Sequence, residues 1–353
     1  MKQDQLQMLL KTPASWLAEG GEESELVFAS RVRLARNIDG RTFTHCAEAS
    51  DLKTVRDEIR DALSLAPSMK DSIFLDMNDM TGPDRMILAE RRLISNDMVS
   101  RSTNRGLAVV RGEKLSVMVN EEDHLRLQSF EQGLALNEAF DRVSRLDDEL
   151  DGSLDFAFSD RFGYLTACAT NVGTGLRVSA MLHLPGLVHN GDIRQVSDGL
   201  RHVRLSVRGS YGEGSEVVGN FFQISNSITL GLSESDTVRN MDSHIRKVLE
   251  FEKKARETLL KEARSLLEDK IWRAHGILGN ARMLDSREAM GLISAVRLGV
   301  GLGIITDTEL TDLNEILIMI QPMHLQMFYE KVMGPDERDR SRADYIRSRL
   351  KAS

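Results

Sequence analysis

The sequence has only two cysteines, Cys46 and Cys168, among its 353 residues. Two thiols cannot form the disulfide framework of a small secreted domain, so we expect a reducing compartment. No stretch approaches the roughly 18 apolar residues of a membrane span, and residues 1–21 are too polar for a signal peptide. These absences predict a cytoplasmic protein that does not bind a membrane.

The chain also has no excess of positive charge; its formal net charge is −8. This excludes the global basic field that attracts nucleic acid, so we expect no direct nucleic acid binding, although positive charge can still gather in one pocket. The chain is long enough for two domains, and its hydrophobic (41%) and charged (28%) contents are ordinary for a globular protein.

The chain up to about residue 240 mixes strand-like and helix-like segments. The segments 107–110 and 115–119 flank a turn at 111–114, which predicts a β-hairpin. The pattern favours an α+β domain, a mainly antiparallel sheet flanked by helices. Its other strands are expected at 26–34, 72–77, 154–158, 203–207 and 221–230, and its helices at 52–65 and 132–147.

Beyond about residue 238 the pattern is almost wholly helical. Apolar residues from Ile245 to Ala274 recur at three- and four-residue steps, which predicts one long amphipathic helix. Asp285-x-x-Glu288 resembles a capping box at the start of the next helix. We therefore expect a helical extension over 1–24, an α+β domain over 25–240 and an all-helical domain over 241–353.

Two segments of the α+β region combine arginines and acids. In 30–37, strand alternation puts Arg31 and Arg33 on one face, where they repel unless an anion lies between them. The alternative is a solvated strand face. In 120–126, three consecutive acids follow an apolar strand, and crowding them is costly unless cations or a metal offset their charge. The alternative is a polar loop or a helix N-terminus.

Two further segments are rich in glycine. In 168–177, small residues and two glycines allow close approach of the backbone to a ligand. Cys168 in this segment is either a reactive thiol or a buried small side chain. In 207–214, three glycines with Arg208 before them and Glu213 among them can fold over a nucleotide, although the segment has neither a Walker nor a dinucleotide-binding pattern.

The four segments together are more specific than each alone. They supply five arginines, whose guanidinium groups match phosphate oxygens and stay charged: Arg31, Arg33, Arg126, Arg177 and Arg208. They also supply two carboxylates, Glu122 and Glu213. A guanidinium acceptor suits this pair, because one carboxylate on each edge fixes its plane and one of them can take the departing proton.

In this combination the chain resembles the guanidino (phosphagen) kinases, the arginine and creatine kinase family. That family has an S-x-R-x-R strand, an N-E-E-D-H-x-R segment, a C-P-T-N-x-G-T loop followed by an arginine, and an R-G-x-x-G-E loop. The resemblance runs in order from Leu26 to Leu232. It implies a fold similar to the catalytic domain of glutamine synthetase, and ATP with Mg²⁺ bridging its phosphates.

The resemblance also implies roles for particular residues. Glu122 is the expected base, Glu213 holds the other guanidinium edge, and Cys168 lies beside the guanidinium. Arg92 stands where the family often has a nucleotide-contacting histidine. The implied nucleotide contacts are Ser30, Arg31, Val32, Arg33, Arg92, Arg126, Arg177, Val178, Ser179, Ala180, Met181, Arg208, Gly209, Ser210, Tyr211, Gly212 and Glu213. No dedicated protein ligand set for a metal is expected.

Several departures point to the bacterial branch of the family that phosphorylates arginines in proteins. Only 29 residues precede Ser30, where small-molecule kinases of the family have a helical domain of about a hundred residues. Tyr211, Gly214 and Ala169 stand where the family usually has arginine, histidine and proline. An open acceptor side suits an arginine on a protein surface.

The C-terminal region adds one motif of this branch, R-D-x-x-R-A, implied to be an allosteric phosphoarginine site. The alternative is a solvated helix in which Asp339 pairs with Arg342. The residues are Arg338, Asp339, Arg340, Ser341, Arg342 and Ala343.

The resemblance implies partners too: substrate proteins with exposed arginines, a heat-shock repressor among them, a Clp-type ATP-dependent protease that degrades the marked proteins, a small zinc-binding activator, and a second copy of the chain in a homodimer. Two other functions remain open. One is a kinase of free arginine or another small guanidino metabolite, and the other is a non-catalytic adaptor that binds phosphoarginine.

Overall fold

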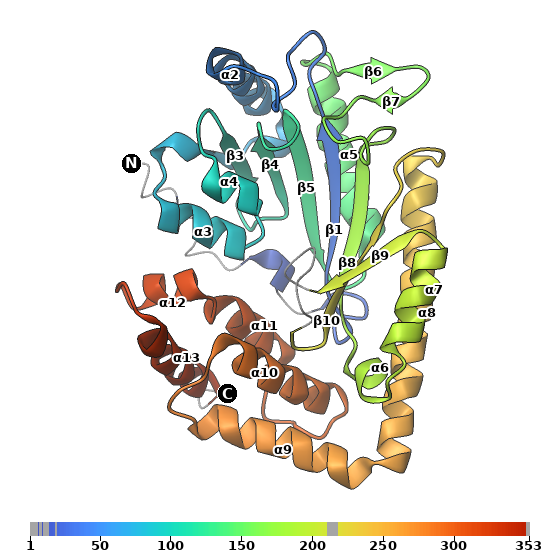
Figure 1. The fold of residues 1–353 in the computed structure, drawn as a ribbon, viewed down its shortest axis with the longest axis vertical. Helices are drawn as coiled ribbons and strands as arrows, with labels where there is room; N and C mark the ends of the chain where they lie inside the picture. Colours follow the sequence, from blue (N-terminus) through green and yellow to red (C-terminus); the bar gives the residue numbers. More distant parts are fainter. Residues whose placement is uncertain (1–5, 7–8, 10–13, 18–19, 210–217, 351–353) are drawn as a thin grey trace. The chain divides into compact units, whose positions relative to one another are not determined.

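The computed structural model describes residues 6, 9, 14–17, 20–209 and 218–350. The chain forms two compact units (Figure 1), neither of which is a continuous stretch. The first unit comprises Met1–Glu22, Ala29–Ala180 and Ser225–Asp242, and the second comprises Glu23–Phe28, Met181–Ile224 and Ser243–Ser353. The division into functional domains at residues 24/25 and 240/241 stays a prediction.

A β-sheet forms the centre of the first unit. The pairs β2–β3, β3–β4, β4–β5 and β5–β1 are antiparallel, which confirms the predicted antiparallel sheet and the hairpin at 111–114. In sheet order the strands are β2 (Ser72–Asp76), β3 (Gly106–Val110), β4 (Leu115–Val119), β5 (Leu125–Gln132), β1 (Val27–Arg36), β8 (Leu176–His183) and β10 (Phe221–Asn226). The first residues of β1 and β10 and the last of β8 belong to the second unit.

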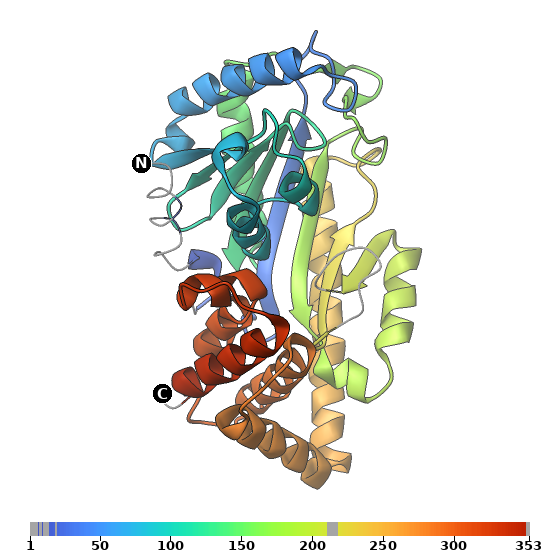
Figure 2. The same cartoon turned by 60° about the vertical axis from the view of Figure 1, so that its left-hand side comes forward.

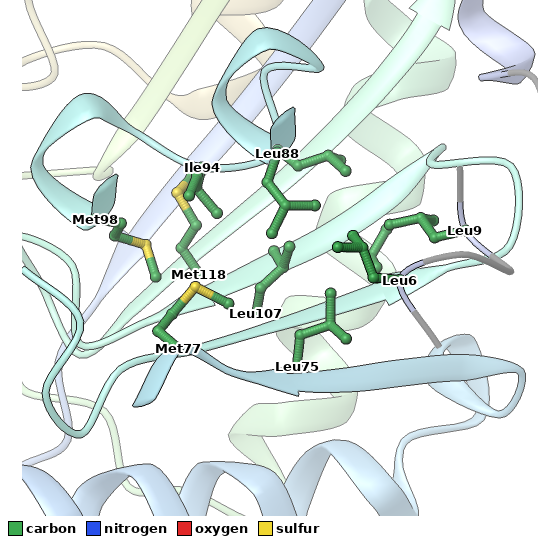
Figure 3. Close-up of a cluster of buried hydrophobic side chains, with 11 residues drawn as sticks. Leu6, Leu9, Leu75, Met77, Leu88, Ile94, Met98, Leu107 and Met118 are labelled. Atoms are coloured by element: carbon green, nitrogen blue, oxygen red, sulfur yellow. The ribbon is translucent and has the colours of Figure 1, made fainter. Parts of the chain in front are cut away.

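Helices cover both faces of this sheet. Figure 1 shows α5 behind the strands and α3 and α4 in front of them. A buried cluster fills the front interface, where Leu75, Leu107 and Met118 of the strands point toward Leu88 and the other side chains of Figure 3. The helices and short hairpin of the unit are η1 (Ser15–Leu17), α2 (Ala49–Leu65), η2 (Pro67–Met69), η3 (Met77–Asp79), α3 (Gly82–Glu90), α4 (Asn96–Ser100), α5 (Leu136–Asp151), β6 (Phe158–Ser159) and β7 (Gly163–Tyr164).

The second unit is mainly helical, as the sequence predicted for the C-terminal region. Here β9 is the eighth strand of the sheet and lies next to β10 at its end. Figure 2 shows α9 to α13 gathered into one cluster, in which α9 packs against α10 and α13. The elements are α6 (Pro185–His189), α7 (Ile193–His202), β9 (Leu205–Gly209), α8 (Glu234–Glu262, shared with the first unit), α9 (Arg264–Asn280), α10 (Ser286–Gly301), α11 (Leu310–Met319), α12 (Pro322–Phe328) and α13 (Pro335–Leu350).

Three segments differ from their sequence-based predictions. The single helix expected through Ala274 is two, because Ala263 has non-helical torsion angles (φ −136°, ψ 27°) between α8 and α9. The strand expected at 154–158 is reduced to one bridge, Ile38 with Phe156, before β6. The strand β10 ends at Asn226, whose side chain donates to the main chain of Ile228 and Leu176. The capping box predicted at Asp285 is confirmed for its N-cap half, since the Asp285 carboxylate accepts from the main-chain N–H of Glu288 at 2.8 Å.

Within the described residues, no helix is long and apolar enough to cross a membrane.

Candidate active site

A hydrogen-bonded framework in the first unit joins the end of β1 to two loops. The Asn37 amide donates to Asp123 Oδ1 at 2.7 Å and accepts from the His124 main-chain N–H at 2.9 Å. Asp123 Oδ1 also accepts from the Ala167 N–H at 2.6 Å. The side chains of Asn37, Asp123 and His124 are all buried. The framework therefore fixes the acidic segment 120–124 against β1 and against the loop that contains Cys168.

His124 extends this framework in one tautomer. Its Nδ1 accepts from the Ile38 N–H at 3.1 Å, so the ring proton lies on Nε2 and is donated to the Thr42 carbonyl at 3.0 Å. Burial lowers the pKa of His124, against the opposing effect of the Thr42 bond. A second proton on Nδ1 would face the Ile38 N–H, so the neutral ring is the form that fits.

This arrangement predicts a pH dependence of stability. A histidine whose pKa is lowered on folding contributes stability at pH values above its unfolded pKa, about 6.5. That contribution is lost as pH falls through 6.5 toward the folded pKa. We expect the unfolding free energy to drop less steeply between pH 7.5 and 5.5 in His124→Gln than in the wild type. Urea denaturation at both pH values measures this, and His45→Gln, at an exposed histidine, is the control. Equal slopes in all three proteins would contradict the assignment.

Arg126 on β5 binds two of the three consecutive acids. Its Nη1 lies 2.6 Å from Glu121 Oε2, and its Nη2 lies 2.7 Å from Glu122 Oε2. The Asn171 amide donates to the same Glu122 oxygen at 3.4 Å. Glu121 is buried, whereas the Glu122 side chain is 40% exposed. The expectation that a cation offsets this acidic run is confirmed, and Glu122 is the acid that remains accessible to an acceptor.

Four of the five arginines predicted to bind phosphate lie on three neighbouring strands, and Arg92 is close enough to act on Arg31. Arg31 and Arg33 lie on β1, between Arg126 on β5 and Arg177 on β8. Burial lowers the pKa of Arg31 to about 9, helped by the positive charges of Arg92, Arg177 and Arg126. Burial also lowers the pKa of Arg33, helped by Arg31, Arg126 and Arg177. So many partly buried like charges are costly unless an anion binds among them.

The other nucleotide contacts expected from β1 and β8 are buried in the sheet. The Ser30 hydroxyl donates to the Gly133 carbonyl at 2.7 Å and accepts from the Ala135 N–H. The Ser179 hydroxyl lies 3.5 Å from Arg31 Nε. Val32, Val178 and Ala180 are core side chains. Contacts of these three with a nucleotide would have to come from main-chain atoms.

The Cys168 loop is held by hydroxyl groups. Thr166 donates to the Cys168 carbonyl at 2.7 Å, and the Cys168 sulfur lies 3.0 Å from the Thr170 hydroxyl oxygen. Thr229 in turn donates to the Thr170 carbonyl at 3.0 Å. Cys168 is only partly buried. Asn171 in this loop contacts Glu122, a role that its place in the loop motif alone did not predict.

The fold itself requires the two glycines of this loop, and their approach to a ligand stays a prediction. Gly173 has a φ of +112°, and a Cβ there would collide with the Thr229 carbonyl oxygen. A Cβ on Gly175, which has a φ of +64°, would lie 2.6 Å from the Ala35 carbonyl oxygen. The close approach is therefore between two parts of the chain's own backbone.

A substitution at Gly173 can separate the cost of its positive φ from the cost of a collision with the Thr229 carbonyl. Gly173→Ala should lower the unfolding free energy by more than the about 1–3 kcal/mol of a strained backbone alone, because it adds a collision. Gly40→Ala is the matched control, since Gly40 also has a positive φ (+68°) but nothing near its Cβ position. Chemical denaturation measures both. Equal losses would mean that the Thr229 contact is not tight.

The remaining candidates lie elsewhere. Met181, Arg208 and Gly209 belong to the second unit, and Ser210, Tyr211, Gly212 and Glu213 lie outside the described residues. Arg36, although adjacent to the first motif, is fully buried and pairs with Asp147 at 2.6 Å. Among the described residues, no group of three or more His, Cys, Asp or Glu side chains is placed to hold a metal ion.

The C-terminal motif lies on α13 in the second unit. Arg342 is buried and donates to the main-chain carbonyls of Ile320 and Leu284. It also pairs with Asp339 at 2.6 Å, which confirms the ion pair of the alternative interpretation. Arg338 is partly buried and donates to the Met333 carbonyl, Arg340 is exposed, Ser341 is partly buried, and Ala343 is buried.

Comparison with known proteins assigns the family. Residues 54–255 match the family model "ATP:guanido phosphotransferase, C-terminal catalytic domain", and residues 264–353 match "Protein-arginine kinase McsB C-terminal domain". The protein-arginine kinase of Halothermothrix orenii is 42% identical over 97% of this chain and 98% of its own. That of Bacillus subtilis is 41% identical over 96% and 93%.

Solved structures agree on the fold. A lombricine kinase superposes with a TM-score of 0.59 and 24% identity over 69% of this chain and 71% of its own. The duplicated taurocyamine kinase of Schistosoma mansoni, with bound transition state analog components, superposes with a TM-score of 0.61 and 28% identity over 74% of this chain and 39% of its own. The chain therefore belongs to the ATP:guanido phosphotransferase family, among its protein-arginine kinases, and phosphorylates arginine with ATP.

Proposed function

We propose that the arginine face of the first unit binds the phosphates of ATP and that Glu122 receives the arginine side chain of a protein. One observation carries this proposal. Arg31 and Arg33 are partly buried among like charges that lower their pKa values. A polyphosphate would offset this positive charge through bidentate guanidinium contacts.

The accessible carboxylate of Glu122 has the chemistry that the acceptor needs. It can accept hydrogen bonds from the guanidinium of the substrate and take its proton as a nitrogen attacks the γ-phosphorus. Arg126 contacts Glu122 and is charge-coupled to Arg31 and Arg33, so it would connect the acceptor to the phosphates. Mg²⁺ would enter with ATP and neutralise its phosphate oxygens. Arg208 and Glu213 are proposed to complete the site.

The choice of acceptor can be measured directly. The release of ADP is followed with an unfolded arginine-rich protein and with free arginine at equal guanidinium concentration. We expect release with the protein and little with the amino acid. Faster release with free arginine would favour the small-metabolite alternative, and binding of phosphoarginine without ADP release would favour the adaptor.

The proposed consequence of the reaction is protein quality control in the cytoplasm. Phosphoarginine would mark proteins for a Clp-type protease and modulate a heat-shock repressor, with a zinc-binding protein as activator and a homodimer as the working form. These proposals follow from the resemblance to protein-arginine kinases, which extends over nearly the whole chain.

We also propose regulation by phosphoarginine at the motif on α13. Because Arg342 is committed to main-chain carbonyls, Arg338 and Arg340 are the cations that remain accessible to a phosphate. We expect free phosphoarginine to raise the initial rate about 5–150-fold, and Arg338→Ala with Arg340→Ala to remove this response while leaving the basal rate. A response that survives in the double variant would place regulation elsewhere.

A further inference from the structure

A groove of about 410 Å³ lies in the first unit beside the Cys168 loop. The β6–β7 hairpin forms one wall, and residues 229–232 with Glu234 form the other. Gly173 and Thr174 also line it, and they belong to the loop that carries Cys168 and Asn171. None of the functions described above uses this groove.

Four large apolar side chains around the groove are exposed to solvent. Phe158 and Phe162 of the hairpin are 57% and 44% exposed, and Leu230 and Leu232 opposite them are 54% and 51% exposed. Single exposed apolar side chains are normal on protein surfaces, but several around one hollow are typical of a binding site. The lining therefore suits an aliphatic or aromatic side chain.

Hydrogen bonds join both walls of the groove to the Cys168 loop. Tyr164 in the hairpin donates its N–H to the Gly173 carbonyl at 2.8 Å, and Thr229 on the other wall donates to the Thr170 carbonyl. Asn171, between these two points, contacts Glu122. The lining residue Gly173 is only two positions after Asn171, so the groove lies within a few residues of extended chain from Glu122.

Charge near the groove favours a cationic segment. Asp147 and Asp151 of α5 and Glu234 in the wall are close enough to act on Tyr164. Asp148 of α5 acts on Asp147 and Glu234. They are opposed by Arg36, buried against Tyr164, and by Arg161, which lies over the Phe162 ring. Of the charged groups that line the groove, Glu234 balances Arg161. The three aspartates of neighbouring α5 add negative charge, which complements an arginine-bearing peptide.

We propose that this groove binds an aliphatic or aromatic side chain next to the target arginine in the protein substrate. The inference rests on the proposed placement of the acceptor at Glu122. It makes the enzyme select arginines with apolar neighbours, which folded proteins bury and unfolded segments expose. The hydrogen bonds to the Cys168 loop and the negative charge of nearby α5 favour a substrate segment as the ligand over a second copy of this acidic chain.

The test compares two peptides, each with one arginine, flanked by leucines or by serines. In the wild type we expect kcat/KM to be about tenfold higher for the leucine peptide, the effect of burying one apolar side chain. Phe158→Ser with Leu230→Ser should reduce this ratio to about one while leaving kcat/KM for the serine peptide unchanged. Leu65→Ser, at a 76% exposed leucine outside the groove, should keep the tenfold ratio.

The outcomes separate the groove from the reaction itself. A ratio near one in the wild type, or a ratio kept in the double variant, would overturn the proposal for the groove alone. Loss of dimers in the double variant with the ratio kept would instead make the groove an interface between copies. Failure of the wild type to phosphorylate either peptide would count against the proposed acceptor site.

Discussion

Glu122→Gln should slow phosphoryl transfer at least about 100-fold, the lower range for loss of a general base. The substitution keeps the size of the side chain and an oxygen that can accept from Arg126 and Asn171, but it removes the charge that would take the proton. ATP affinity should change little, because the arginine face is untouched. Equilibrium nucleotide binding and single-turnover rates measure the two effects separately.

The control for this prediction is Glu138→Gln, at an exposed glutamate on α5. It should leave both quantities near wild type. If the Glu122 variant turned over within a few-fold of the wild type, Glu122 could not be the base. If it lost ATP affinity to the same extent as turnover, its role would be structural.

Arg33→Ala should lower kcat/KM for ATP by about 100- to 1000-fold, as expected for removal of a charged contact that strengthens in the transition state. The same variant should be more stable than the wild type without nucleotide. The reason is that Arg33 is partly buried among other arginines, which together lower its pKa. Relief of about 1 kcal/mol would raise the melting temperature by about 1–2 °C.

Arg145→Ala, at an exposed arginine on α5, is the matched control and should change neither quantity. The opposite signs for activity and stability distinguish a binding residue from a structural one. A variant that lost activity and stability together would show that Arg33 holds the sheet. The assignment of the phosphate site would then be wrong.

Strand alternation was enough to predict the shared face of Arg31 and Arg33. It also explains Arg36, which is offset by an odd number of residues and therefore faces the other side of β1. There it meets Asp147 and lies over the Tyr164 ring. The sequence motif alone does not distinguish the buried, paired Arg36 from Arg31 and Arg33. It contains no information on which side chains lie on each face of the sheet.

Contacts between residues far apart in the chain could not be predicted from the sequence. Asn37 and Thr44 both hold the acidic segment, through the Asp123 carboxylate and the Glu122 carbonyl. Asn37 is the last residue of the segment 30–37, which is a weak signal, whereas Thr44 lies in an irregular segment with no pattern. The positive charge of Arg92 acts on Arg31. Arg92 reaches this position through a turn after α3 in which its φ is positive. Tertiary packing decides such positions, so no periodicity encodes them.

The most direct test of the proposed site is the identification of the phosphorylated atom. An unfolded arginine-rich protein is treated with ATP and the enzyme, and its peptides are analysed by mass spectrometry at neutral pH, which spares the acid-labile P–N bond. We expect ATP-dependent phosphate on arginine with the wild type and with Glu138→Gln, and almost none with Glu122→Gln or Arg33→Ala. Phosphate on serine or threonine instead, or undiminished phosphoarginine with the two site variants, would contradict this account.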